Sequence, residues 1–215
     1  MRTEFDNQLG QLRRNVEQIA GLCQRAIARA GDMLAQPDAA DSSQVDVLET
    51  QIDRLERDIE TLCLRLLLKQ QPVARDLRQI SAALKMITDF ERIGDQAQDI
   101  AHILKSRGGP VEKGSSILQP LFQAVQEMLK NSITAYLTGD LNLAKQVIEG
   151  DAAVDSQFAN ARDLVIRWIA QAPQEGEVAL DLLMIAKYLE RIGDHATNIA
   201  EWAEFSVTGV HRSQN

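Results

Sequence analysis

Glu91-Arg-Ile-Gly-Asp95 and Glu190-Arg-Ile-Gly-Asp194 are two copies of one pentapeptide, and they lie 99 residues apart in a chain of 215 residues. Extended to Phe90–Ala101 and Leu189–Ala200, the copies are identical at eight of twelve positions. Such a duplication indicates two copies of one structural unit. Each copy is long enough to form a hydrophobic core of its own.

Residues 107–116 separate the two copies and read Arg107-Gly-Gly-Pro-Val-Glu-Lys-Gly-Ser-Ser116, a long stretch rich in helix-breaking residues. We therefore divide the chain into a first repeat at residues 1–106, a linker at residues 107–116 and a second repeat at residues 117–215.

Apolar residues recur every three or four positions in both repeats, which is the spacing of an amphipathic helix. Low aromatic content, 4%, also favours helices. The pattern predicts six helices. In the first repeat they are a helix at about 5–34, a second that Ser42 or Ser43 caps and that ends before Gln71-Pro72, and a third that starts after this proline and ends at about 106. In the second repeat they lie at about 117–137, 141–170 and 177–207. The expected fold is all-α, with two tandem antiparallel three-helix bundles.

The net charge is −8 and no basic cluster stands out, so a nucleic-acid surface is not expected, and free phosphate would be repelled unless a metal ion came with it. The charged first residues do not resemble a signal peptide, and no apolar run is long enough to span a membrane. We expect a soluble, cytoplasmic protein that meets membranes only through partners. Cys23 and Cys63 lie on or beside apolar stripes and are expected to be buried free thiols.

Each pentapeptide begins a stripe of polar side chains at positions i, i+4 and i+8 of its helix. The apolar series before the first copy steps by three and four residues and its next member is an acid, so we expect the stripes to face inward. The stripes consist of Glu91, Asp95 and Asp99, and of Glu190, Asp194 and Asn198.

Gly94 and Gly193 occupy the same position in both copies, although glycine inside a helix costs about 0.5–1 kcal/mol relative to alanine. The repeated glycine indicates a limit on space, set either by a neighbouring helix or by a bound ligand.

The middle helix of each repeat carries a second acidic pair, Glu49 with Asp53 and Asp151 with Asp155. Carboxylates that converge between helices repel one another unless some are protonated or a cation neutralises them. Oxygen ligands of this kind suit Mg²⁺, Mn²⁺, Ca²⁺ or iron, with Zn²⁺ also considered. No Glu-x-x-His motif accompanies the pairs, which argues against the usual di-iron redox site. The candidate metal ligands are Glu49, Asp53, Glu91, Asp95, Asp99, Asp151, Asp155, Glu190, Asp194 and Asn198.

Other interpretations remain open from the residues. Acids at this spacing are common on solvated helix faces, and Arg92 and Arg191 can pair with acids of a facing helix. The chain can thus be a metal-free helical scaffold. A metal-dependent phosphoesterase is a further alternative, although no nucleophile–base pair or glycine-rich phosphate loop is evident. His102, His195 and His211 have no partner visible in the sequence.

The two long motifs, the acidic pairs and the stretch Gln71-Pro-Val-Ala-Arg-Asp-Leu-Arg78 together resemble the PhoU family over nearly the whole chain. This resemblance implies two three-helix bundles, metal ions held by the acidic motifs, a homodimer and no enzymatic activity. It further implies negative regulation of phosphate uptake, through the ATPase subunit of a phosphate transporter and a sensor histidine kinase.

The chain departs from the family pattern in its first copy, which has Phe90 where leucine is usual and His102 where the second copy has Glu201. The stripes also differ, because Asp99 corresponds to Asn198. The two metal sites are therefore expected to differ in metal or occupancy.

Overall fold

The computed structural model describes residues 2–35, 41–69, 72–107 and 112–212, and within these ranges it contains helices and no strand. The all-α prediction is thereby confirmed. The helices are α1 (Arg2–Ala35), α2 (Ser43–Lys69), α3 (Ala74–Arg107), α4 (Glu112–Thr138), α5 (Leu141–Gln171), the short 3-10 helix η2 (Pro173–Glu175) and α6 (Gly176–Thr208).

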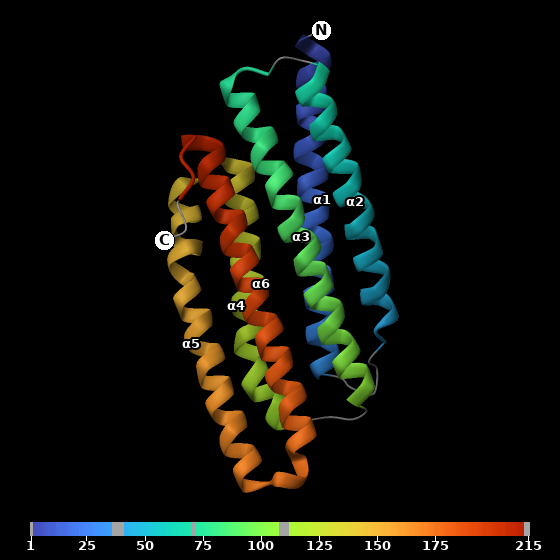
Figure 1. Cartoon of the computed structure of the whole chain (residues 1–215), viewed down its shortest axis with the longest axis vertical. Helices are drawn as coiled ribbons and strands as arrows, with labels where there is room; N and C mark the ends of the chain where they lie inside the picture. The colour runs from blue at the N-terminus through green and yellow to red at the C-terminus, as the bar shows by residue number, and fades with distance from the viewer. Residues whose placement is uncertain (1, 36–40, 70–71, 108–111, 213–215) are drawn as a thin grey trace.

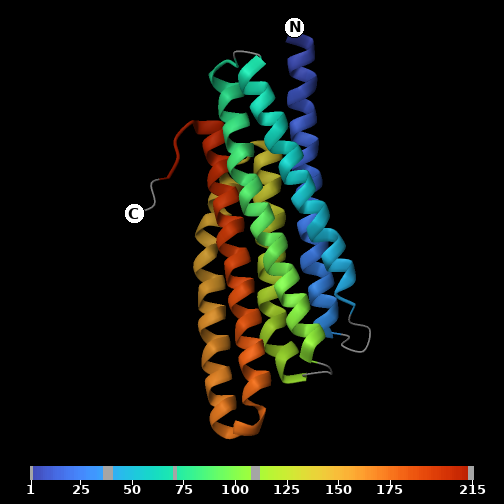
Figure 2. The same ribbon diagram turned by 45° about the vertical axis from the view of Figure 1, so that its right-hand side comes forward.

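Two three-helix bundles lie side by side, α1–α3 in one and α4–α6 in the other, and successive helices run in opposite directions (Figures 1 and 2). The bundles meet where α3 lies along α6 and α1 lies along α4. Because α3 and α6 are antiparallel, the repeats are related by an approximate twofold rotation. This arrangement confirms the tandem bundles predicted from the repeated pentapeptide.

Local sequence explains several helix ends. Asp140 caps α5 by accepting hydrogen bonds from the backbone N–H groups of Asn142 and Leu143, both at 3.0 Å. Gly209 ends α6 with a φ of 77°, a left-handed conformation that glycine adopts without a steric penalty. At the start of α2, the side chain that accepts a backbone hydrogen bond is that of Asp41, from the N–H of Ser43 at 3.0 Å, while the backbone carbonyl of Ser42 accepts from the N–H groups of Val45 and Asp46.

The helix α4 begins at Glu112, five residues before the start expected from the sequence. A start at Ile117 would have placed Pro120 in the first turn, where proline is best tolerated. The additional turn contacts the first bundle, because the Ser115 hydroxyl donates to the backbone carbonyl of Leu34 at 3.4 Å. This tertiary contact is invisible to local sequence rules. The predicted boundary at residues 107–116 otherwise stays a prediction.

The two pentapeptide glycines lie where the middle helix of each bundle approaches most closely. A Cβ atom at residue 94 would lie 3.0 Å from Cδ1 of Ile52 on α2, and one at residue 193 would lie 3.2 Å from Cγ1 of Val154 on α5. Ile52 is 1% exposed and Val154 2%, so neither can move into solvent. Of the two causes considered for these glycines, the neighbouring helix is observed in both repeats.

Cys23 and Cys63 are buried and form no disulfide, as expected from the sequence. The thiol of Cys23 donates to the backbone carbonyl of Phe90 at 3.3 Å, which ties α1 to α3. None of the helices in the described ranges combines the length and the apolar character that crossing a membrane requires.

Replacing Gly94 by alanine tests the helix contact against a matched glycine. Gly150 lies inside α5, and a Cβ atom added there would have no other atom within 4 Å, so Gly150→Ala should raise the free energy of unfolding by about 0.5–1 kcal/mol. Gly94→Ala should fail to stabilise, because overpacking costs about 1–3 kcal/mol. Chemical denaturation measures both.

The variant Ile52→Val removes the methyl group that a new side chain at residue 94 would meet. We expect Ile52→Val to cost less stability in the Gly94→Ala background than in the wild type, a coupling that a double-mutant cycle detects. Equal stabilisation by Gly94→Ala and Gly150→Ala would show that the contact does not limit residue 94.

Candidate metal centre

The first acidic cluster consists of Glu49 and Asp53 of α2 and Glu91 and Asp95 of α3. Ile52 of α2 lies between the two α2 acids in sequence and contacts α3 at Gly94, beside Asp95. The close approach of the two helices therefore brings the four carboxylates to one edge of their interface. All four side chains are partly exposed.

The charges of the first acidic cluster affect one another across the two helices. Burial, then the charges of Asp53 and Asp95, raise the pKa of Glu49. Burial and the neighbouring Asp95 raise the pKa of Glu91, while Arg92 lowers it. The pKa of Asp95 is also raised, first by burial and then, against the opposing effect of Arg92, by Asp53. The α2 acids are thus paired with acids of their own repeat.

Arginines on the same helices partly neutralise this cluster. Arg92 lies 3.3 Å from both a Glu91 and an Asp95 carboxylate oxygen, and Arg57 lies 3.1 Å from Asp53. Both arginine side chains are more than half exposed, so such pairs contribute only about 0–1 kcal/mol each. Arg92 pairs within α3 and not with a facing helix.

The second acidic cluster consists of Asp151 and Asp155 of α5 and Glu190 and Asp194 of α6. Asp155, Glu190 and Asp194 each offer a carboxylate oxygen, and these three oxygens all lie within 4.8 Å of one another. Within the described ranges, no other three His, Cys, Asp or Glu side chains meet this condition. Three carboxylates so close together can share one cation.

Crowding of negative charge is strongest at Asp194. Loss of hydration, followed by the charges of Glu190 and Asp151, raises the pKa of Asp194 to about 6, although its side chain remains open to solvent. The pKa of Asp151 is also raised, first by burial, although the Thr197 hydroxyl donates to it at 3.2 Å. Burial and mutual repulsion together therefore disfavour the ionised forms of Asp151 and Asp194.

Lys187 places a positive charge beside the second acidic cluster. Its Nζ atom lies 2.6 Å from Oε1 of Glu190 and 5.3 Å from the centre of the Phe158 ring. The Glu190 side chain is only 12% exposed, and Lys187 forms an ion pair with it. A metal ion at Glu190 would compete with Lys187.

The third member of each polar stripe faces the other bundle. Asn198 donates to Oδ1 of Asp89 at 3.0 Å, and Nδ1 of His195 lies 2.9 Å from the same oxygen. At the related position, Asp99 is exposed and interacts with Tyr188 of α6, whose pKa is raised by burial first and then by this carboxylate. The structure therefore does not bring Asn198 and Asp99 into the centre of either cluster.

Further acids extend both clusters and were not among the predicted ligands. Asp46 contributes to the raised pKa of Glu49, Glu56 to that of Glu91, and Asp151 to that of Glu201. Asp46 and Glu56 continue the three- and four-residue spacing of the α2 acids, so the sequence contained the signal that would have found them.

His102 and Gln98 of α3 both contact Asp46 of α2. His102 Nε2 lies 2.7 Å from Oδ1 of Asp46, and the Gln98 side-chain amide donates to the same oxygen at 2.9 Å. His102 and His195 therefore have carboxylate partners that the sequence did not reveal, and in both cases the partner lies outside the four acids of a cluster.

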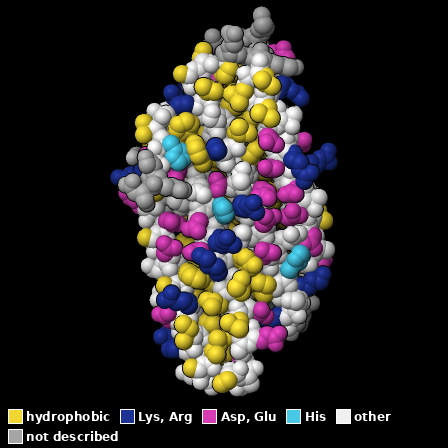
Figure 3. Space-filling model, in the orientation of Figure 1, with side chains coloured by type: hydrophobic (Ala, Val, Ile, Leu, Met, Phe, Trp, Pro, Cys, Tyr) yellow, Lys and Arg dark blue, Asp and Glu magenta, His cyan; other side chains and the backbone are white. Residues whose placement is uncertain are grey.

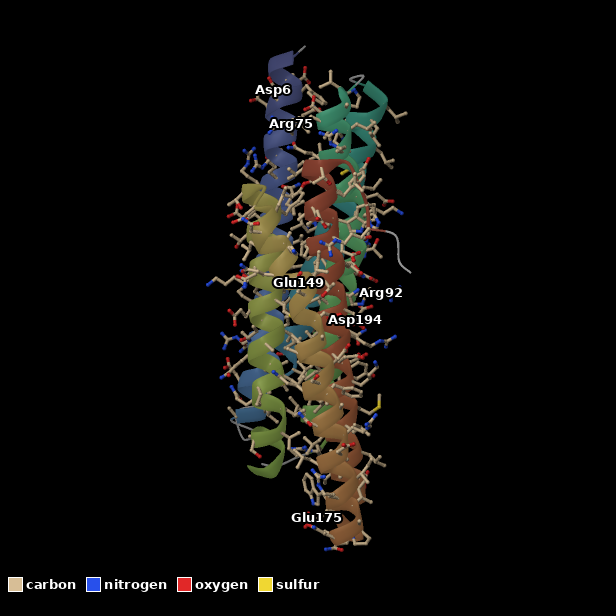
Figure 4. The ribbon with its side chains drawn as sticks, turned by 90° about the vertical axis from the view of Figure 1, so that its left-hand side faces the viewer. Asp6, Arg75, Arg92, Glu149, Glu175 and Asp194 are labelled. Carbon is tan, nitrogen blue, oxygen red and sulfur yellow. The ribbon has the colours of Figure 1, made fainter. Side chains whose placement is uncertain are left out.

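Both acidic clusters lie on the same face of the molecule. Figure 3 shows acidic side chains gathered on one side over α2 and α3 and on the other over α5 and α6. In Figure 4 Asp194 lies about halfway along the molecule. The expectation of inward-facing stripes is thus only partly met, because the acids line the rims of two helix interfaces and remain accessible to solvent. Glycine contacts, and not the acids, fill the centres of those interfaces.

Fold and site together define a class of protein: an all-α tandem repeat in which each three-helix unit presents one carboxylate cluster. The family model described as the PhoU domain matches this chain twice, at residues 16–104 and 118–203. The chain belongs to the PhoU family, which confirms the resemblance found in the sequence.

Named relatives support the same assignment. The phosphate-specific transport system accessory protein PhoU homolog of Pseudomonas aeruginosa is 31% identical over 96% of this chain and 86% of its own length. The protein of the same name from Clostridium acetobutylicum is 31% identical over 95% of this chain and 94% of its own length.

Solved structures share the architecture. The crystal structure of PhoU from Pseudomonas aeruginosa superposes with a TM-score of 0.91 at 31% identity, covering 96% of this chain and all of that one. The regulatory protein PhoU from Streptococcus pneumoniae superposes with a TM-score of 0.85 at 23% identity, covering 98% of this chain and 100% of that one, and shows the same fold.

The raised pKa of Asp194 predicts a specific pH dependence of stability. Between its ordinary value of 3.8 and the folded value of about 6, the folded protein binds more protons than the unfolded chain. Stability contributed by this group therefore falls as pH rises through that window. In chelator-treated protein, Asp194→Asn should raise the melting temperature at neutral pH. The same variant should have little effect at a pH near 3.8, where Asp194 of the folded protein is protonated.

Asp163→Asn is the matched control for this experiment. Asp163 is an exposed α5 carboxylate 3.2 Å from Arg162, outside both clusters. Melting temperatures measured across the acidic to neutral range should show a pH-dependent gain for Asp194→Asn alone. A gain of the same size at every pH, or in both variants, would contradict charge crowding at Asp194.

Proposed function

We propose that this protein is a non-enzymatic, metal-binding regulator that restrains a phosphate transporter and phosphate-starvation signalling. Its relatives carry the name of accessory proteins of a phosphate-specific transport system, at about 31% identity over most of the chain. That name describes a protein acting with a transporter and not a catalyst.

One observation carries the metal part of the proposal: three carboxylate oxygens from Asp155, Glu190 and Asp194 lie within 4.8 Å of one another. Their residues come from two helices fixed by the Gly193 contact, so the donors are held in place by the core. The raised pKa of Asp194 supports the same interpretation, because burial raises it first and the charges of Glu190 and Asp151 second, and a divalent cation would offset that repulsion.

The donor set bears on which metal fits. Asp151, Asp155, Glu190 and Asp194 supply only oxygen atoms, which are the ligands preferred by Mg²⁺, Mn²⁺ and Ca²⁺ and also used by iron. Zn²⁺ more often takes nitrogen or sulfur ligands. We infer that the second acidic cluster holds a hard divalent cation or iron, whose contribution is positive charge at the rim of the α5–α6 interface.

The first acidic cluster is inferred to hold a second metal more weakly. Arg92 and Arg57 already place positive charge beside three of its four carboxylates. A cation must compete with these arginines, whereas the second acidic cluster has Lys187 at Glu190 alone among its four acids. Unequal occupancy was also expected from the Asp99 and Asn198 difference.

The regulatory role requires partners. We infer that the protein acts in the cytoplasm as a homodimer, binding the ATPase subunit of a phosphate transporter and a sensor histidine kinase. Both clusters lie on one face, so metal binding changes the charge of a single broad surface (Figure 3). Such a change alters electrostatic complementarity with a partner more than it alters the fold.

Manganese binding tests the metal part. Titration of Mn²⁺ into chelator-treated protein, followed by calorimetry and by the melting temperature, should show saturable binding and stabilisation. Without metal, the Asp194→Asn variant should be more stable than the wild type. Its affinity for Mn²⁺ should nevertheless be lower by at least about tenfold, because one ligand is lost.

Two further variants sharpen this test. Asp95→Asn should affect only the weaker site, and Asp163→Asn should affect neither. Elemental analysis showing no metal above background, both in the isolated protein and after reloading, would contradict metal binding and leave the regulatory role to be judged separately.

Association with the transporter tests the regulatory part. Purified protein should retain the ATPase subunit of the phosphate transporter in a pull-down, and deletion of its gene should raise phosphate uptake. Hydrolysis of p-nitrophenyl phosphate that is lost in Glu91→Ala would instead establish the phosphoesterase alternative.

A further inference from the structure

A pocket of about 410 Å³ opens where α1, α3, α4 and α6 meet, away from both acidic clusters. Residues from both repeats line it, and three of them are arginines: Arg13, Arg75 and Arg78. None of its lining residues within the described part of the chain is acidic. Figure 4 shows Arg75 near one end of the molecule and Asp194 about halfway along it.

The three guanidinium groups come from distant parts of the sequence. Arg13 belongs to α1, while Arg75 and Arg78 lie in the first turns of α3, which begins at Ala74. The N-terminus of a helix carries partial positive charge, which Asp76 in the same first turn offsets in part, and the two arginines there still favour an anion nearby. Backbone N–H groups at such an end add further donors for an anion.

The described lining of the pocket supplies no negative charge. The described residues include no ion pair to any of the three arginines, and Nε of Arg78 is buried without a hydrogen-bond partner. Arg13 donates to the backbone carbonyl of Leu137 at the end of α4, which anchors that arginine and leaves other N–H groups on its guanidinium.

Arg78 is held in place by the end of α6. Gly209 has a φ of 77°, and a Cβ atom there would lie 3.0 Å from Cδ of Arg78. The glycine thus lets the backbone pass against the aliphatic part of this side chain. An arginine fixed by packing loses less entropy on binding a ligand than one that moves freely in solvent.

The opposite end of the molecule shows that the fold does not require an unpaired basic pocket. The approximate twofold relation places Glu177 at the position of Arg78. There Arg107 lies close enough to Asp181 for each charge to influence the pKa of the other. Arginine and acid are therefore close together at that end, whereas the described lining of the pocket at the other end holds three arginines and no acid.

We propose that this pocket binds a phosphate group, carried by inorganic phosphate or by a small phosphomonoester. Arginine presents paired N–H donors that match phosphate oxygens, and several guanidinium groups together suit a doubly charged anion. The hydroxyls of Thr138 and Ser206 already donate to the carbonyls of Thr134 and Ala203, so the arginines carry the recognition. This site is independent of the metal proposal.

Calorimetry on chelator-treated full-length protein tests the pocket without metal-bridged phosphate. The probes are inorganic phosphate, phenyl phosphate and a hexaglutamate peptide. We expect saturable binding of one phosphate group per chain, weakened by at least about tenfold in Arg78→Gln and in Arg75→Gln, since each removes charge-assisted hydrogen bonds.

Arg162→Gln is the matched control, because it removes one exposed arginine of α5 outside the pocket. Circular dichroism of each variant verifies folding. If inorganic phosphate binds at least as tightly as phenyl phosphate, the ligand of the pocket is the free anion. If phenyl phosphate binds more tightly, the ligand is an organic phosphate. Three results would overturn the proposal. The first is binding of hexaglutamate without binding of inorganic phosphate or phenyl phosphate, and the second is the absence of saturable phosphate binding in the millimolar range. The third is a loss of phosphate affinity in Arg162→Gln equal to that in the pocket variants.

Discussion

The contact of each pentapeptide glycine with the middle helix of its bundle determines most of what is distinctive in this structure. Gly94 meets Ile52 and Gly193 meets Val154, and a Cβ atom at either glycine would lie only 3.0 or 3.2 Å from its neighbour, closer than ordinary van der Waals contact. Each apolar partner is adjacent in sequence to an acid, Asp53 or Asp155. Close helix packing and carboxylate crowding therefore have the same cause. The contact that fills the centre of each interface also brings the acids together at its rim, and the packed core holds them there despite their repulsion.

The duplicated unit also determines how the bundles join. Because α3 and α6 lie antiparallel across the approximate twofold, equivalent positions of the two stripes face the opposite repeat. On one side, the Asp89 carboxylate contacts the side chains of Asn198 and His195. On the other side, the Asp99 carboxylate interacts with the Tyr188 side chain. At each of these contacts an acid meets a hydrogen-bond donor of the other repeat and not a second acid, which would repel it. The change from Asp99 to Asn198 supplies a donor for the Asp89 carboxylate, which accounts for that departure without reference to a metal.

The sequence predicted the helices, the tandem bundles and the acidic pairs of α2, α3, α5 and α6 because these follow from periodicity and internal duplication, but it left open whether the pairs join within one repeat or between repeats. It did not predict which side chains face which. Asp99 and Asn198 share the spacing of the true cluster members, yet four residues on an α-helix advance beyond one full turn, and this drift carries them to the α3–α6 contact. Asp46 and Glu56 were missed although their spacing was visible. Two hydrogen bonds from Ser43 to Asp41 accompany the start of α2, and one from Ser115 to Leu34 accompanies the early start of α4; no periodicity encodes these contacts.

Net charge was the least informative sequence property for this protein. A total of −8 suggested that anions would be repelled, and no basic run appeared along the chain. Folding separates the charges instead: acids gather on one face midway along the molecule, and Arg13, Arg75 and Arg78 meet near one end. Electrostatic potential decays over about 10 Å at moderate ionic strength, so the attraction of this pocket for anions depends mainly on the charges nearest to it, and the described residues of its own lining include three arginines and no acid. A single acidic protein can thus present one surface suited to cations and another suited to anions, and only the packing of α1 and α4 against α3 and α6 reveals the second.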